Sequence, residues 1–232
     1  MGIKERQERD RESVRRAILD AARDLFVRDG FDRVSIRKIA ELIEYSPAAI
    51  YGYFSSKDDI FFALAEEGFQ LLAGEQPLDV PGSSAHSGSP LDGVRDIFWR
   101  FYVFSREHPQ YFALMFVDRS VPRISREYER FASAREMRQS LIAHVEAAVA
   151  AGVLPATVPA DVMFRMLSSG IIGVAVARLS DRLAQGENAD ALARDVIDVT
   201  LAGLRSTPLI HSTSAPCPTE APTHALLDAR LS

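Results

Sequence analysis

The chain has 232 residues, of which 47% are hydrophobic, so it can bury one large core or two smaller ones. Its formal net charge of −5 argues against a protein that coats nucleic acid or membrane by bulk attraction alone. The charge is unevenly distributed, however, because residues 1–57 carry 12 basic and 10 acidic side chains, whereas the rest carries 15 and 22. We therefore expect a mildly basic N-terminal region joined to an acidic body.

Several classes of protein are excluded by the distribution of special residues. The single cysteine, Cys217, cannot form an intramolecular disulfide, which fits a reducing cytoplasm. The five histidines lack metal-ligand spacing, and the chain has neither a phosphate-cradling glycine loop nor a nucleophile motif. The charged N-terminus is unlike a secretory signal, and the most apolar run, Ile171–Ala177, is too short to span a membrane. We expect a cytoplasmic protein that is not an enzyme and has no cofactor, metal or membrane partner.

Composition divides the chain into five parts. Residues 1–12 read as a charged arm, and residues 13–72 show the apolar spacing of short helices. The segment 73–90 is rich in Gly, Pro and Ser, which is typical of a flexible linker. Helical spacing returns over 91–205 without a convincing strand pattern, and the tail 206–232 is expected to be disordered. The sequence thus predicts an all-α fold with a small N-terminal domain and a larger C-terminal one.

The N-terminal domain contains the signals of a helix-turn-helix. Apolar residues recur at helical spacing from Val14 to Phe26, and Gly30 provides a left-handed stop. Ser35 can cap a second helix, and Ser46 followed by Pro47 is the order expected at the start of a third. This run resembles the reading head of a protein that inserts a helix into the major groove of DNA.

The third helix has an unusual outward face. A solvated helix would ordinarily carry Glu, Lys and Gln there, whereas small and aromatic residues allow close approach to a partner and present hydroxyls to phosphates. A surface that simply carries few charges is the alternative. The residues concerned are Pro47, Ala48, Ala49, Tyr51, Gly52 and Tyr53.

Lys57 provides a separate indication of an anionic partner. It follows the expected cap Ser56, and the dipole disfavours a cation in the first turn of a helix. A DNA phosphate bound at this helix start would remove that penalty. The alternative is a lysine that points into water at a cost of a few tenths of a kcal/mol.

Taken together, these positions closely resemble the N-terminal domain of the tetracycline-repressor (TetR) family of bacterial regulators, over about residues 12–64. The resemblance implies an all-helical homodimer with a helix-turn-helix head and a C-terminal body that dimerises and binds small molecules. The residues that carry it are Ile18, Leu19, Ala21, Ala22, Leu25, Phe26, Gly30, Ile39, Ala40, Ser46, Ile50, Tyr51, Tyr53, Phe54 and Lys57.

By position, the resemblance implies specific contacts with DNA. Arg37 would reach a base edge, where an arginine suits bidentate contact with guanine. Glu44 departs from the family, which usually has Gly in this turn, and a left-handed conformation there would carry a cost. Groove-facing apolar contacts are implied for Pro47, Ala48 and Ala49, and contacts to the DNA backbone for Ser35, Ser46, Tyr51, Tyr53 and Lys57.

The C-terminal body is expected to enclose an effector pocket. An aromatic helix starts at Ser89 and Pro90, and the string HPQYFALMF that follows resembles the signature of one TetR C-terminal subgroup. A long helix from about Ser125 to Ala151 places His144 on an apolar face. Ordinary core packing is the alternative for each expected pocket residue: Trp99, Tyr102, Tyr111, Met115, Phe131, Met137, His144, Met163 and Met166.

Two final helices, about 159–183 and 190–205, are apolar enough to form a subunit interface as a four-helix bundle across a two-fold axis, although intramolecular packing alone remains open. A symmetric dimer predicts a palindromic double-stranded operator. We expect a repressor released by a small hydrophobic ligand. An activator of the same fold is the first alternative, and a helical small-molecule-binding protein without DNA binding is the second.

Overall fold

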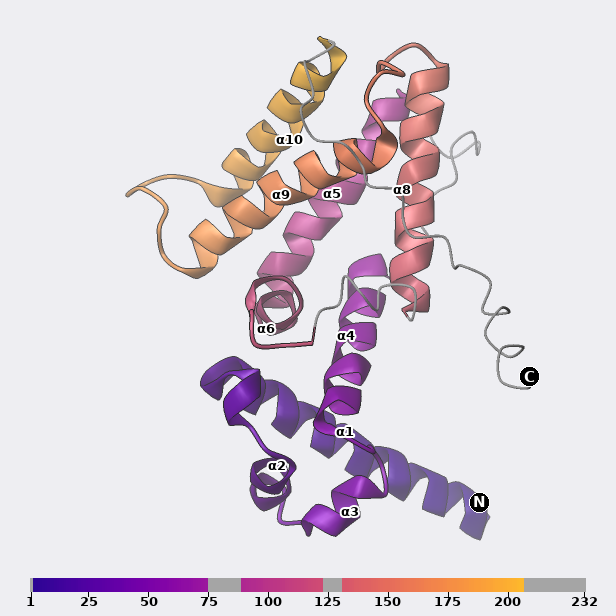
Figure 1. Cartoon of the computed structure of the whole chain (residues 1–232), viewed down its shortest axis with the longest axis vertical. Helices are drawn as coiled ribbons and strands as arrows, with labels where there is room; N and C mark the ends of the chain where they lie inside the picture. The colour runs from indigo at the N-terminus through magenta and orange to yellow at the C-terminus, as the bar shows by residue number, and fades with distance from the viewer. Residues whose placement is uncertain (1, 75–88, 123–130, 207–232) are drawn as a thin grey trace, which may run out of the picture.

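The computed structural model describes residues 2–74, 89–122 and 131–206, and over these ranges it is all-helical, as expected (Figure 1). Most of the expected linker, 75–88, and nearly all of the expected tail, from 207, lie outside the described residues. In chain order the helices are α1 Ile3–Asp29, η1 Phe31–Arg33, α2 Ile36–Leu42, α3 Pro47–Tyr51, α4 Lys57–Ala73, α5 Pro90–Glu107, α6 Pro109–Phe112, η2 Ala113–Val117, α8 Ala132–Ala150, α9 Ala160–Leu179 and α10 Ala189–Arg205.

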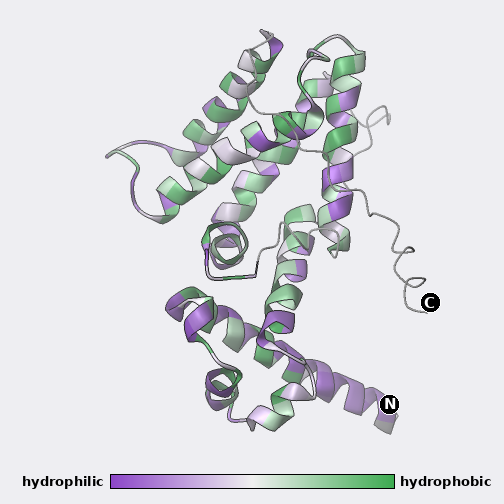
Figure 2. Ribbon diagram, in the orientation of Figure 1, coloured by the Kyte–Doolittle hydropathy of each residue, from purple (hydrophilic) through white to green (hydrophobic). Residues whose placement is uncertain are grey.

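The first four helices build a head at one end of the molecule, and α4 runs from this head into the body (Figure 1). Apolar residues of α1, α2 and α3 meet inside the head, and the ribbons of these helices carry both green and purple segments (Figure 2). Ile18, Phe26, Ile39 and Ile50 are each completely buried there. This small core fixes the orientation of the short helix α3, which is too short to be stable alone.

Helix ends in the head follow the local signals in the sequence. Gly30 stops α1 with a φ of 84°, and its N–H donates to the carbonyl of Phe26. The Ser35 hydroxyl accepts from the Lys38 N–H at the start of α2. Ser46 caps α3 in the same way, with Pro47 in the first helical position. The helix-turn-helix prediction is therefore confirmed at the level of its helix ends.

The N-terminal segment expected to be a charged arm is helical instead, because α1 begins at Ile3. The Gly2 N–H donates to the Glu5 carboxylate at 3.0 Å, which satisfies one of the free donors at this end. Lys, Arg, Glu and Gln are good helix formers, so the segment extends α1 although its side chains are exposed.

The body consists of α5, α8, α9 and α10, with α6 and the π-helical turn η2 at the junction with the head (Figure 1). Close crossings are possible where one helix carries glycine. A Cβ on Gly93 of α5 would lie 2.1 Å from the His144 ring of α8, and a Cβ on Gly170 of α9 would lie 2.6 Å from Val196 of α10. α8 begins at Ala132, later than expected, and residues 123–130 lie outside the described ranges.

α9 is one helix that is long and apolar enough to cross a membrane by length and composition alone. Of its most apolar window, 39% is buried inside the molecule, and the core helix of a water-soluble protein passes the same test. α9 packs against α10, α5 and α8, which explains the part of its apolar surface that is buried.

Candidate nucleic-acid interface and body cavity

The turn between α2 and α3 contains a residue in the left-handed conformation. Glu44 has a φ of 59°, where a side chain is disfavoured, and the next N–H, of Tyr45, donates to the carbonyl of Ala40 at 2.9 Å. Glu44 therefore carries the conformational free-energy cost that was expected for a non-glycine residue in this turn. Despite it, α3 is placed against α2 as in a helix-turn-helix.

α3 presents its small and aromatic residues to solvent. Ile50 is completely buried and Phe54, which follows the helix, is nearly so, and these two side chains anchor α3 to the head. On the outward side Tyr51 is 57% exposed, whereas Tyr53 is half-buried. Pro47, Ala48 and Gly52 are exposed and Ala49 is partly so. The face predicted to enter a DNA groove is thus open, except for part of Tyr53.

The polar residues predicted to contact DNA flank this face. Arg37 is exposed on α2 and makes an ion pair with Glu41 at 2.8 Å. The hydroxyls of Ser35 and Ser46 accept backbone hydrogen bonds, so each can still donate its hydrogen to a phosphate oxygen. Sequence reasoning did not include Tyr45, which is an exposed aromatic residue in the turn beside α3.

Lys57 has a partner within the chain that the sequence did not reveal. Its ammonium donates to the carbonyl of Phe31 at 2.7 Å and lies 4.0 Å from the centroid of the Phe31 ring. These contacts offset the unfavourable position of a cation at the start of α4. The helix-dipole argument therefore no longer requires a phosphate, and a DNA contact by Lys57 stays a prediction.

The body contains an apolar cavity of about 180 Å³ bordered by α4, α5, η2, α8 and α9. No charged side chain lines it. Of the nine residues expected in an effector pocket, Met137 is the one found in this lining. The lining consists of Phe69, Leu72, Ile97, Phe98, Phe101, Phe116, Met137, Leu141, Phe164, Ser168 and Ile172.

Two of the expected pocket residues face α10 instead. The guanidinium carbon of Arg194 lies 3.9 Å from the centroid of the Trp99 ring. The hydroxyl of Tyr102, a completely buried residue, donates to Asp190 at 2.7 Å. Burial and this hydrogen bond raise the pKa of Tyr102 to about 12. Both rings therefore hold α5 against α10, away from the cavity.

Other expected pocket residues are part of the surrounding core or surface. Phe131 packs between Phe62 and Phe69, with ring centroids 6.1 and 5.2 Å away, and so lies behind the cavity wall. Met163 is completely buried, and Met166 is exposed on α9. The helical spacing that identified them is shared by core, surface and pocket residues alike.

His144 follows the core alternative. Its Nδ1–H donates to the carbonyl of Ser140 at 2.8 Å, and its ring lies against Gly93 of α5. It does not line the apolar cavity. Within the described residues no group of three or more His, Cys, Asp or Glu side chains is arranged to hold a metal ion.

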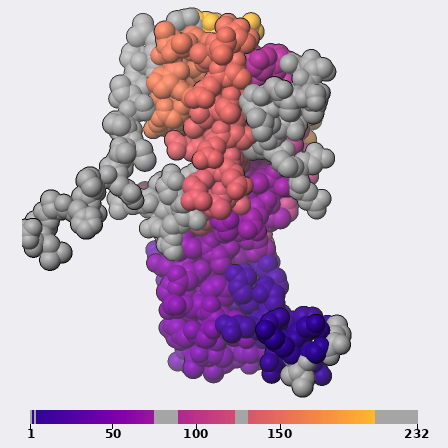
Figure 3. All heavy atoms as spheres, turned by 90° about the vertical axis from the view of Figure 1, so that its right-hand side faces the viewer, coloured from indigo at the N-terminus to yellow at the C-terminus, as the bar shows by residue number. Residues whose placement is uncertain are grey.

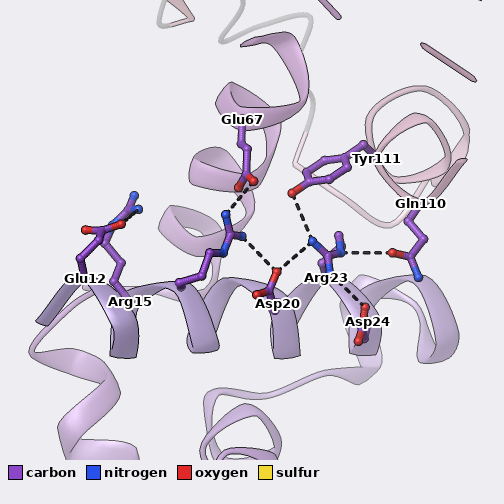
Figure 4. A network of polar contacts seen from close by, with 9 residues as sticks. Glu12, Arg15, Asp20, Arg23, Asp24, Glu67, Gln110 and Tyr111 are labelled. Carbon is purple, nitrogen blue, oxygen red and sulfur yellow. Dashed lines mark hydrogen bonds and ion pairs between the residues drawn. The ribbon is translucent and has the colours of Figure 1, made fainter. Parts of the chain in front are cut away.

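A polar network joins the head to the body (Figure 4). Arg16 on α1 pairs with Glu67 on α4 at 2.6 Å. Arg23, two turns further along α1, donates to the Tyr111 hydroxyl at 3.3 Å and to Gln110 at 3.1 Å, and both partners are on α6. The sequence did not predict these contacts, because the partners are 51 to 88 residues apart. Of the residues involved, Tyr111 alone was expected at a site, and that site was the effector pocket.

The protonation states of this network are set by burial and by the contacts themselves. Burial raises the pKa of Glu67, but hydrogen bonds from Arg16 and Tyr111 outweigh it and hold that pKa below its ordinary value. Burial is also the main reason why the pKa of Tyr111 is raised. At neutral pH the network therefore contains a charged Arg16 and Glu67 pair beside a neutral Tyr111.

α4 touches the junction most closely at Gly68. A Cβ at this position would lie 2.3 Å from the Met115 sulfur and 3.3 Å from the Tyr111 ring. Two residues expected in the effector pocket, Tyr111 and Met115, are therefore packed against the α4 backbone. Because the next residue, Phe69, lines the cavity, α4 connects the cavity wall directly to the head.

Residues 18–64 match the family model of bacterial regulatory proteins of the tetR family. Residues 96–200 match that of a tetracyclin repressor-like C-terminal domain. The latter does not identify the subgroup expected from HPQYFALMF. Together the two matches cover the head and most of the body.

Individual relatives agree with these matches. The chain is 42% identical over 59 residues to the HTH-type transcriptional repressor Rv1474c of Mycobacterium tuberculosis, covering 25% of this chain and 32% of the relative. It is 36% identical over 90 residues to the nicotine-responsive transcriptional repressor HdnoR of Paenarthrobacter nicotinovorans, covering 37% and 43%. The chain thus spans less than half the length of these curated relatives.

A solved structure extends the similarity to the whole fold. The TetR family regulator PfmR of Thermus thermophilus superposes with a TM-score of 0.60 and 24% identity. The superposition covers 81% of this chain and 98% of PfmR. At this identity the similarity concerns the fold alone.

Proposed function

The chain belongs to the TetR family of bacterial regulatory proteins, and on that basis we propose that it is a cytoplasmic repressor that leaves its operator when a small apolar ligand binds its body. The observation that carries the proposal is the open, uncharged face of α3, anchored by Ile50 and exposing Tyr51. The proteins of this family are transcriptional regulators and not enzymes. Repression is chosen over activation because the curated relatives are named repressors.

DNA recognition is proposed to use both heads of a homodimer. Two α3 helices enter successive major grooves when they are about 34 to 36 Å apart, one turn of B-DNA. Arg37 would read a base edge, and Tyr51 and the cap hydroxyls of Ser35 and Ser46 would bind phosphates. The operator would then be a palindrome or close to one.

The dimer is proposed to form through α9 and α10. Val199 on α10 is 70% exposed, and the large hydrophobic residues Met166 and Leu179 on α9 are exposed as well. Burying this surface against a second copy would form a four-helix bundle and would account for the apolar character of α9. Small exposed residues nearby allow close approach of the two copies: Ser169, Gly173, Ala202 and Gly203.

The effector is proposed to be a small, uncharged and largely apolar compound that binds in the 180 Å³ cavity. A cavity of about 150 Å³ lined by apolar side chains can hold benzene, so a single-ring compound matches the available volume. The lining contains no charged side chain, so a charged ligand would be buried there without a partner of opposite charge. Phe69 and Leu72 of α4 border the cavity, so a ligand that displaces them moves the helix that enters the head.

Release requires the ligand to favour one arrangement of the heads over another. A coupling free energy of about 1 to 3 kcal/mol between the two sites would lower operator affinity by about 5 to 150-fold. The Arg16 and Glu67 pair and the Arg23 and Tyr111 contact join α1 to α4 and α6. We infer that they carry this coupling.

The experiment that tests DNA recognition is selection of duplexes from a random pool with purified protein. We expect recovery of a palindrome whose affinity falls steeply with added salt. A screen of uncharged aromatic compounds against that operator then tests release. Absence of salt-sensitive binding to any duplex would contradict the proposal, and a compound that binds tightly without changing operator affinity would be excluded as the effector.

A further inference from the structure

We propose that the N-terminal turns of α1 form a second DNA-binding element, which holds the phosphate backbone beside the groove entered by α3 through Lys4, Arg11 and Arg15. This inference rests on the proposed DNA-binding function and extends its site to a segment outside the matched family domain, which begins at residue 18.

The first observation is that these turns bury no side chain in the core of the head. α1 has 27 residues, yet every described side chain from Lys4 to Ser13 is exposed, and the contacts of α1 with the head core begin at Val14. Figure 3 shows the indigo N-terminal turns projecting sideways from the head. They are drawn as a hydrophilic segment in Figure 2. A folded helix whose side chains are all exposed offers most of its surface to a partner.

The second observation is where this projection lies. The N-terminal end of α1 is at the same end of the molecule as α3 (Figure 1). The guanidinium carbon of Arg11 lies 5.6 Å from the Tyr53 ring centroid, and that of Arg15 lies 5.5 Å from the Phe54 ring. Both arginines therefore border the end of α3, so the basic side chains are continuous with the face proposed to bind DNA.

The third observation is how charge is arranged around the helix. At about 100° per residue, Lys4, Arg11 and Arg15 lie within about 40° of one another, on the side that faces the core further along α1. Arg6 lies on the opposite side. Among the described residues, Lys4 and Arg11 make no ion pair with a carboxylate. Glu8 adjoins this basic stripe and Glu12 pairs with Arg15 at 3.5 Å, so both acids would reduce the attraction of the stripe for phosphate.

The length of the projection fits the width of a groove. At a rise of 1.5 Å per residue, the turns before Val14 reach about 15 Å beyond the core of the head. The major groove is about 12 Å wide, so a helix that leaves the head beside α3 can reach the backbone that borders this groove. The three cations are about 10.5 Å and about 6 Å apart along that helix, so together they can face several phosphates of one strand, which carries a charge about every 3.4 Å of duplex axis.

The test uses the full-length dimer and its selected operator, in a long duplex and in one trimmed at both ends so that it lacks the flanking phosphates that the N-terminal turns of α1 would reach. Arg11→Gln removes one charge from the basic stripe, and Arg6→Gln is the matched control on the opposite side. We expect Arg11→Gln to weaken binding to the long duplex about 3- to 10-fold, and to reduce the slope of log K against log salt by about 1 per protomer. Arg6→Gln should change the affinity for the long duplex by less than about twofold and should leave the salt slope unchanged.

Two further measurements complete the test. Arg11→Gln should have little effect on the trimmed duplex, and Glu8→Gln should tighten binding to the long one. Equal effects of Arg11→Gln and Arg6→Gln, or no effect of Arg11→Gln on the long duplex, would overturn this inference and leave the proposed function intact. If the unaltered protein bound no duplex in a salt-dependent manner, the proposed function itself would fail.

Discussion

At Glu44 the turn between α2 and α3 adopts a positive φ although the residue is not glycine. The φ of 59° places an acidic side chain in a conformation that glycine adopts freely. The same side chain adds negative charge beside the proposed phosphate contacts. We therefore expect this residue to lower both folding stability and DNA affinity, and substitutions can separate the two effects.

Glu44→Gly should raise the free energy of unfolding by about 0.5 to 1 kcal/mol, because relief of the left-handed strain exceeds the added flexibility of the unfolded chain. Glu44→Ala keeps the strain and should give no such gain. Both variants should bind the operator more tightly than the parent, since both remove the acid. Urea unfolding and a DNA titration at fixed salt measure the two effects. Equal stabilisation by Ala and Gly would refute the conformational explanation.

Arg37 and Tyr51 should differ in what they contribute to DNA binding. Arg37→Ala should relax preference at one base position by about 1 to 3 kcal/mol, because a bidentate base contact is lost. Tyr51→Ala should weaken binding to all sequences by a similar factor, since a phosphate contact carries no base information. Competition between the operator and its single-base variants distinguishes the two. A uniform loss with Arg37→Ala would place this arginine on the backbone.

Among the elements, α4 has the most varied role. Its first turn is tied to η1 by Lys57 and Phe31, its middle to α1 by Glu67, and its last two turns border the cavity with Phe69 and Leu72. Figure 4 shows how the α1 arginines reach both α4 and α6 across the junction. A shift of α4 therefore has to change polar contacts as well as packing.

Glu67→Gln should lower the free energy of unfolding at neutral pH by about 1 to 2 kcal/mol, through loss of a charge-assisted hydrogen bond with Arg16. Because the pKa of Glu67 is held below the ordinary carboxyl value of 4.5, this stabilisation is present above that value. It is lost as the pH falls through the folded-state pKa. The difference between parent and variant should therefore shrink in acid.

The control is Glu12→Gln, which breaks an exposed pair with Arg15 and should change stability by less than about 0.5 kcal/mol at any pH. Denaturant unfolding between neutral and acidic pH gives both differences. A gap between parent and Glu67→Gln that stays constant with pH would mean that the carboxylate charge does not stabilise the junction. Glu67→Gln should also weaken the effect of ligand on operator affinity.

At the scale of the whole molecule, α9 and α10 expose apolar residues that α5 and α8 do not cover, and this is the surface proposed to bind a second copy. Val199 is the most exposed large hydrophobic residue in the described part of the chain. The two heads of a dimer would be spaced by this surface. Subunit association and operator recognition should therefore be lost together.

Val199→Glu should raise the dissociation constant of the dimer at least about tenfold, because a charge would be buried at the interface without a partner. Val27→Glu is the matched control, since Val27 is an exposed valine on α1, away from α9 and α10. Sedimentation velocity at decreasing concentration measures the subunit equilibrium. Unchanged dimers with Val199→Glu would place the interface elsewhere.

The sequence by itself determined the helical fold, the end of α1, the starts of α2 and α3 and the open face of α3. These features depend on capping hydroxyls, a left-handed glycine and apolar spacing, all of which act over a few neighbouring residues. It also located the unfavourable turn at Glu44, because a missing glycine is visible without any tertiary contact. The extension of α1 to Ile3 also depends on local helix propensity, but the high charge of this segment favours the prediction of an arm.

Only the tertiary structure decided which aromatic residues surround the cavity, that Lys57 binds the Phe31 carbonyl, and that Arg16 and Arg23 hold α4 and α6. Helical spacing tells which side of a helix is buried, but it does not tell which neighbour buries it. Met137 and Met163 therefore look alike in sequence, yet one borders the cavity and the other lies in solid core. The junction contacts join residues 51 to 88 positions apart, and they exist only once the head and body have packed together.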